Sequence, residues 1–481
     1  MECILLIYPK LEVYMSRYRV PPRVDSFLTR TLSGPVFTWR QIIDLMIPGV
    51  LDSLSIMFIM MLITALISSN GETSVAAVAL VSPITALISC MFNGVAAGGS
   101  VVVAQSLGRN DPNQIQRSIG NALVFTFAIG VVICLPFLSA PFGILHLLYP
   151  SAEPEVMEKA MTFLSGSIWS LFSFALFQAC FNILRGLGES KRCLWLSIII
   201  NVAYLLLSIL FLNVLNMDIK GSVLALFLAR TIGAACAVIT LFFLHPPVKP
   251  DFKEMFKFDR KLAGGILKVG VPLAFEQICL SVGNIVAEMY MILLGTTALA
   301  THAIANSIMG LIFAPAMSTA NLAVAVVGRC IGAGEYDEAY RYGKSCTVIS
   351  HILMGAACLI GYPLLPVLLK QYNPSPEVAE MATRLLYWSL IGLIFFYPKS
   401  GTMPAVLRAG SDTLYPTIVS MIVLWVFTIG MGYLLAIPMG LGLNGTWIAM
   451  WTAWAVRSTL FASRYRSKKW LYVTKKVDSK A

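Results

Sequence analysis

The chain has 481 residues, of which 58% are hydrophobic and only 12% are charged, and its mean hydropathy is +0.79. A soluble protein of this length needs far more charge to cover its surface, so the composition excludes a soluble globular protein. The net charge of +11 could serve to bind nucleic acid, to bind anionic lipid or to orient the chain in a membrane. The distribution of the basic residues along the chain distinguishes these three roles.

Apolar stretches recur along the whole chain, and each is long enough, at about 20 residues, to cross a bilayer as a helix. The sequence predicts twelve spans, at residues 42–67, 74–103, 118–140, 157–183, 193–215, 221–244, 266–294, 297–325, 345–369, 383–407, 414–437 and 443–463. We therefore expect an all-α integral membrane protein with twelve transmembrane helices.

The basic residues lie mainly on one side of this layout. If both termini are cytoplasmic, the cytoplasmic segments hold 28 of the 35 Lys and Arg residues and the outer loops hold four. This asymmetry predicts a multi-pass plasma-membrane protein with both termini in the cytoplasm. The positive charge then orients the protein, and we expect no nucleic-acid partner.

The two halves of the chain repeat each other at an offset of about 224 residues. The paired positions are Pro48 and Pro272, Asp52 and Glu276, Gly108 and Gly332, Gly221 and Gly445, and, at offset 223, Arg185 and Arg408. An apolar chain built twice over is typical of secondary transporters, whose binding site lies between the repeats. The fold class predicted is two pseudo-symmetric six-helix bundles.

Five regions follow from this layout. We expect a cytoplasmic tail at 1–40, the first bundle at 41–244, a charged cytoplasmic linker at 245–268, the second bundle at 269–463 and a basic cytoplasmic tail at 464–481. Within the linker, residues 252–268 have the composition of an amphipathic helix lying on the inner leaflet.

Polar turns follow the second and fourth spans of each half. Residues 96–111 (AAGGSVVVAQSLGRND) correspond to 323–335 (AVAVVGRCIGAGE), and 184–191 (LRGLGESK) correspond to 407–413 (LRAGSDT). With the proline-bearing first spans and the twelve-span layout, these paired turns resemble the multidrug and toxic compound extrusion (MATE) family over residues 38–463.

The resemblance implies secondary active export of small amphipathic, often cationic compounds by antiport with Na⁺ or H⁺, by a monomer in contact with membrane lipids. It implies neither an enzyme nor a cofactor. The turn residues have a structural interpretation, because glycine ends helices tightly and arginine anchors the inner interface. We assign that structural role to Gly108, Arg109, Arg185, Gly332 and Arg408.

Carboxylates inside the spans are the first candidates for the substrate or ion cavity, because a buried charge is costly unless it is paired or hydrated. Asp52 and Glu276 each lie four residues after the repeated proline, and Glu276 lies about 12 Å into its span by helix rise. Glu288 lies twelve residues further along the same span. One carboxylate is expected to face the cavity while another pairs with a neighbour.

Lys399 is the candidate that departs most from the family. One branch of the family is expected to pair a carboxylate on span seven with one on span ten, and another to use acids on spans one and five. This chain has Lys399 on span ten and no acid on span five. Lys399 lies about 13 Å from the inner edge by helix rise, near the depth of Glu276, so we predict a breakable Lys399–Glu276 pair.

Uncharged polar residues complete the candidate cavity lining. They are Gln178, Asn182 and Asn201, and each has the alternative role of a hydrogen bond between or within helices. The cysteines form no CxxC pair, and His302 and His351 stand alone, so we expect no metal site.

Two alternative functions remain open at this stage. One is a flippase for a lipid-linked oligosaccharide or another lipid, which cationic residues such as Lys399, Arg230 and Arg457 favour. The other is a membrane-embedded enzyme, which needs a catalytic histidine with acidic partners, and the sequence offers none.

Overall fold

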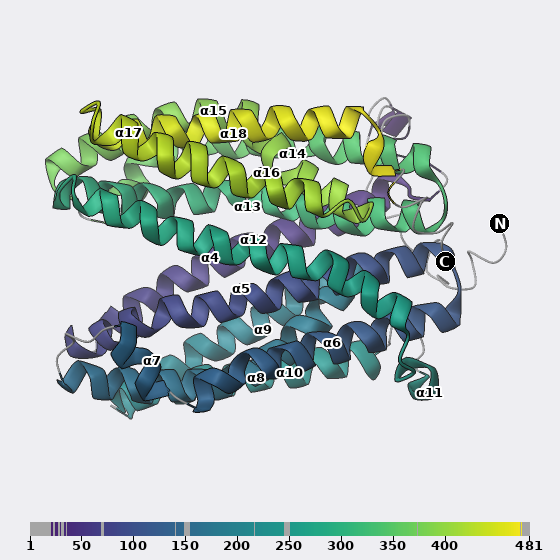
Figure 1. The fold of residues 1–481 in the computed structure, drawn as a ribbon, viewed down its shortest axis with the longest axis horizontal. Coiled ribbons are helices and arrows are strands. Elements are labelled where there is room, and N and C mark those ends of the chain that lie inside the picture. Colours follow the sequence, from purple (N-terminus) through teal and green to yellow (C-terminus); the bar gives the residue numbers. More distant parts are fainter. Residues whose placement is uncertain are drawn as a thin grey trace.

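The computed structural model describes residues 36–68, 72–139, 141–148, 154–215, 217–244, 251–372 and 374–471, with a few residues between 21 and 34 and residue 473. Most of the two predicted tails and residues 245–250 of the linker lie outside these residues. The described part of the chain is all helical and contains no strand. Figure 1 shows the helices running side by side along one axis.

The first half contains the first six membrane-spanning segments and one short extra helix. Its elements are α4 (Trp39–Ser68), α5 (Glu72–Arg109), α6 (Pro112–Ser139), α7 (Pro141–Leu148), α8 (Pro154–Gly186), α9 (Ser190–Ser208) continued by the π-helix η1 (Ile209–Val214), and α10 (Asp218–Phe242).

The second half repeats this order after the short helix α11 (Phe252–Met255). Its elements are α12 (Arg260–Ile292), α13 (Thr296–Gly332), α14 (Tyr336–Lys370), α15 (Pro376–Ala409), α16 (Leu414–Val423) continued by the π-helix η2 (Leu424–Met431) and α17 (Gly432–Ala436), and α18 (Gly442–Arg466). The fifth span of each half therefore carries a π-helical segment.

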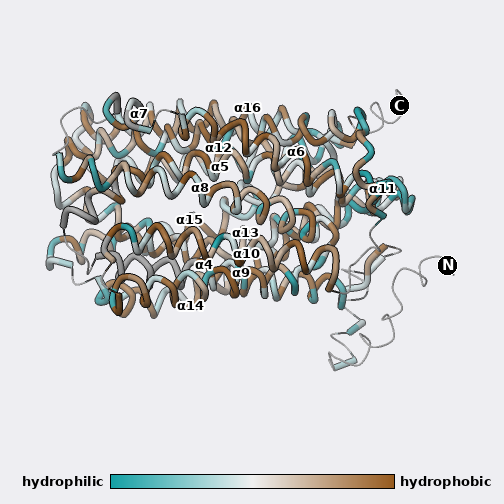
Figure 2. The backbone as a smooth tube through the Cα atoms, turned by 90° about the horizontal axis from the view of Figure 1, so that it is seen from below, coloured by the Kyte–Doolittle hydropathy of each residue, from teal (hydrophilic) through white to brown (hydrophobic). Residues whose placement is uncertain are grey.

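Ten of the helices in the described residues are long and apolar enough to cross a membrane. The remaining two spans are α4 and α18, with 30 and 25 residues, which exceed the roughly 20 residues that a bilayer requires. The helices are brown along their middle and hydrophilic at both ends in Figure 2, as a membrane-spanning bundle requires. The prediction of twelve helices in two bundles is confirmed.

Several helices begin earlier than the apolar pattern predicts. The third span begins at Pro112 and the ninth at Tyr336, because hydropathy reports only the part of a helix inside the bilayer.

The turns that end α8 and α13 use Gly188 and Gly334, whose φ angles of +82° and +78° favour glycine. Proline at the start of α15 fits the free first turn of a helix.

The predicted amphipathic helix over 252–268 is wrong. Asp251 accepts hydrogen bonds from the amides of Lys253 and Glu254 and starts α11, which ends at Met255. Asp259 then accepts from the amides of Lys261 and Leu262 and starts α12. Two N-capping aspartates thus divide the segment into a single helical turn and the beginning of the seventh span.

The first helices of the two halves cross between the bundles. We call the end of the molecule where α4 begins, α11 lies and α18 ends the α11 end, at the right of Figure 1. There Trp39 and Ile42 of α4 belong to the apolar core of the second half, beside Tyr342. Ile266 of α12, the repeat partner of Ile42, belongs to the core of the first half. The first helix of each half therefore begins in the apolar core of the other half.

Candidate functional site

The backbones of the two halves approach each other closely where α5 crosses α13 at the α11 end. A Cβ atom added at Gly108 would overlap the Arg329 carbonyl oxygen, and one at Gly332 would overlap the Gln105 carbonyl oxygen. Gly108 and Gly332 are repeat partners, and so are Gln105 and Arg329, each pair at offset 224. Two equivalent positions thus need glycine for one symmetric reason, which is close approach of the opposite backbone.

A side-chain contact reinforces this crossing. Gln105 donates from Nε2 to the Ala409 carbonyl oxygen at 2.7 Å, and its Nε2 lies 3.1 Å from the Ser411 hydroxyl. Ala409 is the last residue of α15 in the other half, and Ser411 lies in the turn that follows it. At the α11 end the two halves are therefore joined by close backbone packing and by hydrogen bonds.

The carboxylate of the first half is paired with an arginine. Arg185, at the end of α8, donates from a terminal nitrogen to Oδ2 of Asp52 on α4 at 2.9 Å. The Asp52 side chain is only 3% exposed, and the guanidinium also lies 4.4 Å from the ring centre of Phe181. The second oxygen of Asp52, Oδ1, is buried and has no hydrogen-bond partner among the described residues.

The carboxylate of the second half is paired in the equivalent way. Arg408, at the end of α15, donates to Oε2 of Glu276 on α12, and the Thr417 hydroxyl donates to the same oxygen at 3.0 Å. The Glu276 side chain is 5% exposed. Each half therefore holds one buried carboxylate on its first span against an arginine from the last turn of its fourth span.

The structural interpretation of Arg185 and Arg408 was incomplete, because each contacts a candidate carboxylate. Gly108 and Gly332 keep their structural role, and Arg109 is exposed at the end of α5. A signal for the pairs was present in the sequence. Asp52 precedes Arg185 by 133 residues and Glu276 precedes Arg408 by 132, so carboxylate and arginine recur together. Thr417 was missed because a lone threonine in an apolar span carries no pattern.

The predicted Lys399–Glu276 pair is wrong. Glu276 is committed to Arg408 and Thr417, and in the described part of the chain Lys399 forms no ion pair. Lys399 and Arg408 are nine residues apart on α15, which is about two and a half turns. They therefore lie on opposite faces of the helix, and equal depth does not imply contact.

Glu288 and the amide residues occupy separate places. Glu288 is exposed on α12, four residues before the helix ends and far from the α11 end. Gln178 donates to Asn93 on α5, and Asn182 donates to the Gln178 carbonyl oxygen at 3.0 Å. Asn201 donates to the Ser197 carbonyl oxygen of its own helix at 2.8 Å. The candidates thus form no single cluster.

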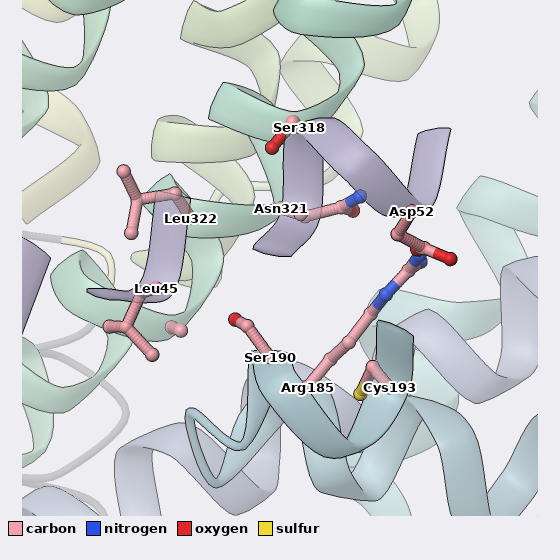
Figure 3. Close-up of a pocket in the computed structure, with 10 residues that line it drawn as sticks. Leu45, Asp52, Arg185, Ser190, Cys193, Ser318, Asn321 and Leu322 are labelled. Atoms are coloured by element: carbon pink, nitrogen blue, oxygen red, sulfur yellow. The ribbon is translucent and has the colours of Figure 1, made fainter. Parts of the chain in front are cut away.

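A pocket lies against the Asp52–Arg185 pair, between the halves (Figure 3). The first half contributes Leu45, Gly49, Asp52, Arg185, Ser190 and Cys193, and α13 of the second half contributes Ser318, Asn321, Leu322 and Ala325. In Figure 3 the Arg185 side chain extends to Asp52, and Asn321 extends toward Asp52 from α13, which also contributes Ser318 to the pocket. Polar groups from both halves therefore meet beside one buried carboxylate.

The same region offers no evident metal site. Among the residues that the structure describes, no group of three or more His, Cys, Asp or Glu side chains is close enough to hold a metal ion. The polar groups of the pocket are one carboxylate, one guanidinium, two hydroxyls, one thiol and one amide. These groups can form hydrogen bonds with a water molecule, and the cavity volume of about 20 Å³ leaves room for little more.

Comparison with known proteins gives a consistent result. The MatE family model matches residues 48–212 and again residues 272–434. The chain is 24% identical over 455 residues to "Probable multidrug resistance protein YoeA" of Bacillus subtilis, covering 92% of this chain and 96% of that protein. It is 23% identical to "Probable multidrug resistance protein NorM" of Thermotoga maritima, covering 90% and 93%.

Solved structures share the fold. A structure described as the outward-facing conformation of a multidrug resistance MATE family transporter superposes with a TM-score of 0.83 at 20% identity, covering 94% of this chain and all of that one. A MATE crystal structure in complex with MaL6 superposes with a TM-score of 0.82, covering 89% and 97%.

Proposed function

The chain belongs to the MATE family of multi-pass membrane transporters, and from that premise we propose that it exports small amphipathic compounds by antiport with Na⁺ or H⁺. The names of its relatives, which refer to multidrug resistance, support the substrate class. The protein acts as a monomer in the plasma membrane, with both ends of the chain in the cytoplasm. The charge asymmetry of the sequence supports that orientation.

The observation that carries the coupling proposal is the repeated carboxylate–arginine pair. Removing one partner of a buried ion pair leaves an uncompensated charge, so the state of the carboxylate and the position of the arginine are linked. Arg185 and Arg408 begin the turns next to the crossing of α5 and α13, and Gln105 bonds to the turn after Arg408. A cation or proton that binds to the carboxylate therefore weakens its pair with the arginine, and this loosens the contact between the halves.

This coupling needs a difference in cation affinity between two arrangements of the halves. Asp52 and Glu276 are the coupling candidates because each is paired with an arginine at the end of a helix next to the crossing of the two halves. Glu288 is exposed and lies far from the crossing, toward the end of the molecule opposite the α11 end.

The test is transport by purified protein in proteoliposomes, with Na⁺ and H⁺ gradients imposed separately. Antiport requires dye efflux that rises with one of these gradients and stops when an ionophore collapses it. Efflux that ignores both gradients would reject coupling, and absence of efflux for every dye would reject export.

A second candidate function is the translocation of a lipid-linked oligosaccharide or another lipid across the bilayer. The observation that favours it is the set of cations inside the spans, Arg230, Lys399 and Arg457, which suit a phosphate-bearing headgroup. Movement of a labelled lipid, but of no dye, in the same proteoliposomes would decide for this function.

A further inference from the structure

Three cations inside the membrane spans form no ion pair with a carboxylate in the part of the chain that the structure describes. They are Arg230 on α10, Lys399 on α15 and Arg457 on α18. Asp52 and Glu276 are already paired with Arg185 and Arg408. A cation in a low-dielectric span is costly until an anion or polar groups compensate it.

Arg230 lies at the centre of its span. It is twelve residues from either end of α10, about 18 Å by helix rise. Its guanidinium donates to the buried Ser170 hydroxyl at 2.7 Å and lies 4.6 Å from the ring centre of Phe174. Arg230 remains half-buried, so part of it reaches space that protein atoms do not fill.

Arg457 lies on the sixth span of the second half, α18, but 227 residues separate it from Arg230, so the two arginines are not repeat partners. Its guanidinium lies 5.7 Å from the ring centre of Phe461, and its Nε is buried without a hydrogen-bond partner. Glu276, Tyr397 and Arg408 are all close enough to interact electrostatically with the Arg457 charge, Glu276 most strongly, although Glu276 forms its ion pair with Arg408. Arg457 is also half-buried.

The aromatic neighbours are repeat partners. Phe174 and Tyr397 are separated by 223 residues, the offset that also relates Arg185 to Arg408. Each bundle therefore places an arginine of its sixth span near an aromatic side chain of its fourth. Tyr397 also stacks on Phe313 with ring centres 4.3 Å apart, which adds apolar surface beside the cation.

The charges inside the spans sum to a positive interior. The two carboxylate–arginine pairs are neutral, Glu288 contributes one negative charge near the opposite end, and the three unpaired cations contribute three positive charges. A positive interior lined by aromatic rings attracts an anionic head on an apolar body and repels an organic cation.

We propose that the substrates of this transporter carry an anionic group, a carboxylate, sulfonate or phosphate, which Arg230 and Arg457 bind in the two bundles while the neighbouring aromatic rings contact the apolar body. The proposal rests on the proposed export function and reverses the charge that the family resemblance implies. The anionic head can belong to a free amphiphile or to a lipid, because both present the same charged oxygens to a guanidinium.

The experiment uses the full-length protein in proteoliposomes and three xanthene dyes of similar size that are anionic, zwitterionic and cationic. We expect the anionic dye to be transported fastest. In Arg457→Gln and in Arg230→Gln its transport should fall about tenfold, the loss of one charge-assisted hydrogen bond, while cationic dye transport stays equal or rises. Arg457→Lys keeps the charge and should restore most of the rate.

Arg384→Gln is the matched control. It removes an exposed arginine from α15, eight residues after the helix begins, and should change the transport of no dye. A second arm measures inward and outward movement of fluorescent phosphatidylglycerol, with phosphatidylcholine as the neutral comparison. Faster movement of the anionic lipid assigns the anion to a headgroup, and movement of the anionic dye alone assigns it to a free amphiphile.

The outcomes separate this inference from the function on which it rests. Transport of the cationic dye with exclusion of the anionic dye overturns the anion proposal and leaves export intact. Equal losses for all three dyes in the arginine variants also overturn it. A folded protein that moves neither dye nor lipid rejects the proposed function and this inference together.

Discussion

Thr417 occupies in the second half the position that Cys193 occupies in the first, at offset 224, yet only Thr417 bonds to the nearby carboxylate. Its hydroxyl donates to Glu276 at 3.0 Å, whereas the Cys193 thiol donates to the Phe181 carbonyl oxygen at 3.7 Å. Among the residues that the structure describes, Asp52 therefore bonds to Arg185 alone and keeps one buried oxygen without a partner. The two carboxylates share a plan and differ in how firmly they are held.

Exchange of these two residues tests the difference. Cys193→Thr should supply the missing donor to Asp52 and stabilise the protein by about 1 kcal/mol, because a hydrogen bond to a charged group is worth about 1.5–3 kcal/mol before losses in packing. Thr417→Cys should destabilise by about 1–2 kcal/mol. Thermal unfolding in detergent measures both.

Cys193→Val and Thr417→Val are the matched controls, since neither can donate a hydrogen bond. If Asp52 changes partners during transport, Cys193→Thr should also slow the cycle although it stabilises the protein. A stabilised variant that transports at the wild-type rate would remove Asp52 from coupling.

Loss of one partner of the second pair should cost more than loss of both. Arg408→Ala leaves Glu276 buried with Thr417 as its one remaining hydrogen-bond partner in the described part of the chain, and breaking a buried pair costs about 3–5 kcal/mol. Adding Glu276→Gln should recover part of that cost, because the unpaired charge disappears. A double variant less stable than Arg408→Ala would contradict a direct pair.

Coupling through Glu276 has a separate test. Glu276→Gln should abolish gradient-driven efflux while substrate still binds, because the amide neither gains nor loses a cation or proton. Binding is followed by quenching of intrinsic tryptophan fluorescence, and efflux is followed in proteoliposomes. Retained dependence on Na⁺ or pH in this variant would shift coupling to Asp52 or Glu288.

Lys399 and Glu276 should behave as independent residues. They are not in contact, and Lys399 lies on the face of α15 opposite to Arg408. We expect the effects of Lys399→Ala and Glu276→Gln on the free energy of unfolding to add within about 0.5 kcal/mol. A larger interaction energy in the double-mutant cycle would show that the two side chains meet in another arrangement of the halves.

The glycine crossing should tolerate no side chain. Gly108→Ala and Gly332→Ala each place a Cβ against the opposite backbone, so contact at the α11 end is weakened. We expect slower export and higher accessibility of this end to thiol reagents. Gly264→Ala and Gly355→Ala are controls at helical positions with nothing within 4 Å of the added carbon, and they should leave export unchanged.

Orientation can be measured directly. A cysteine at Lys257, next to α11, should react with a membrane-impermeant thiol reagent only after permeabilisation, and one at Gln371, after α14, should react in intact cells. The wild-type protein provides the background from its native cysteines. Labelling of the Lys257 site in intact cells would reverse the proposed topology.

The sequence by itself determined the number of spans, their approximate limits and the two-fold repeat. The length of each apolar stretch and the positions of glycine, proline and arginine are local properties of the sequence, and the thickness and charge of the bilayer act on them directly. The sequence also placed Asp52 and Glu276 at equivalent positions, because an offset needs no structure. It failed where a short local signal competed with composition, as at Asp251 and Asp259, which divide the linker helix.

Only the tertiary structure decided which charges meet. Lys399 and Glu276 lie at similar depths along their helices, which suggested a pair. In the structure, however, Glu276 bonds to Arg408 and Thr417, because the packing of α12 and the direction of the side chains bring those groups together. The exchange of Ile42 and Ile266 between the two cores was equally hidden, since an apolar residue does not show which bundle buries it. Contact between helices depends on rotation and crossing as well as on depth, and those follow from how all the spans pack together.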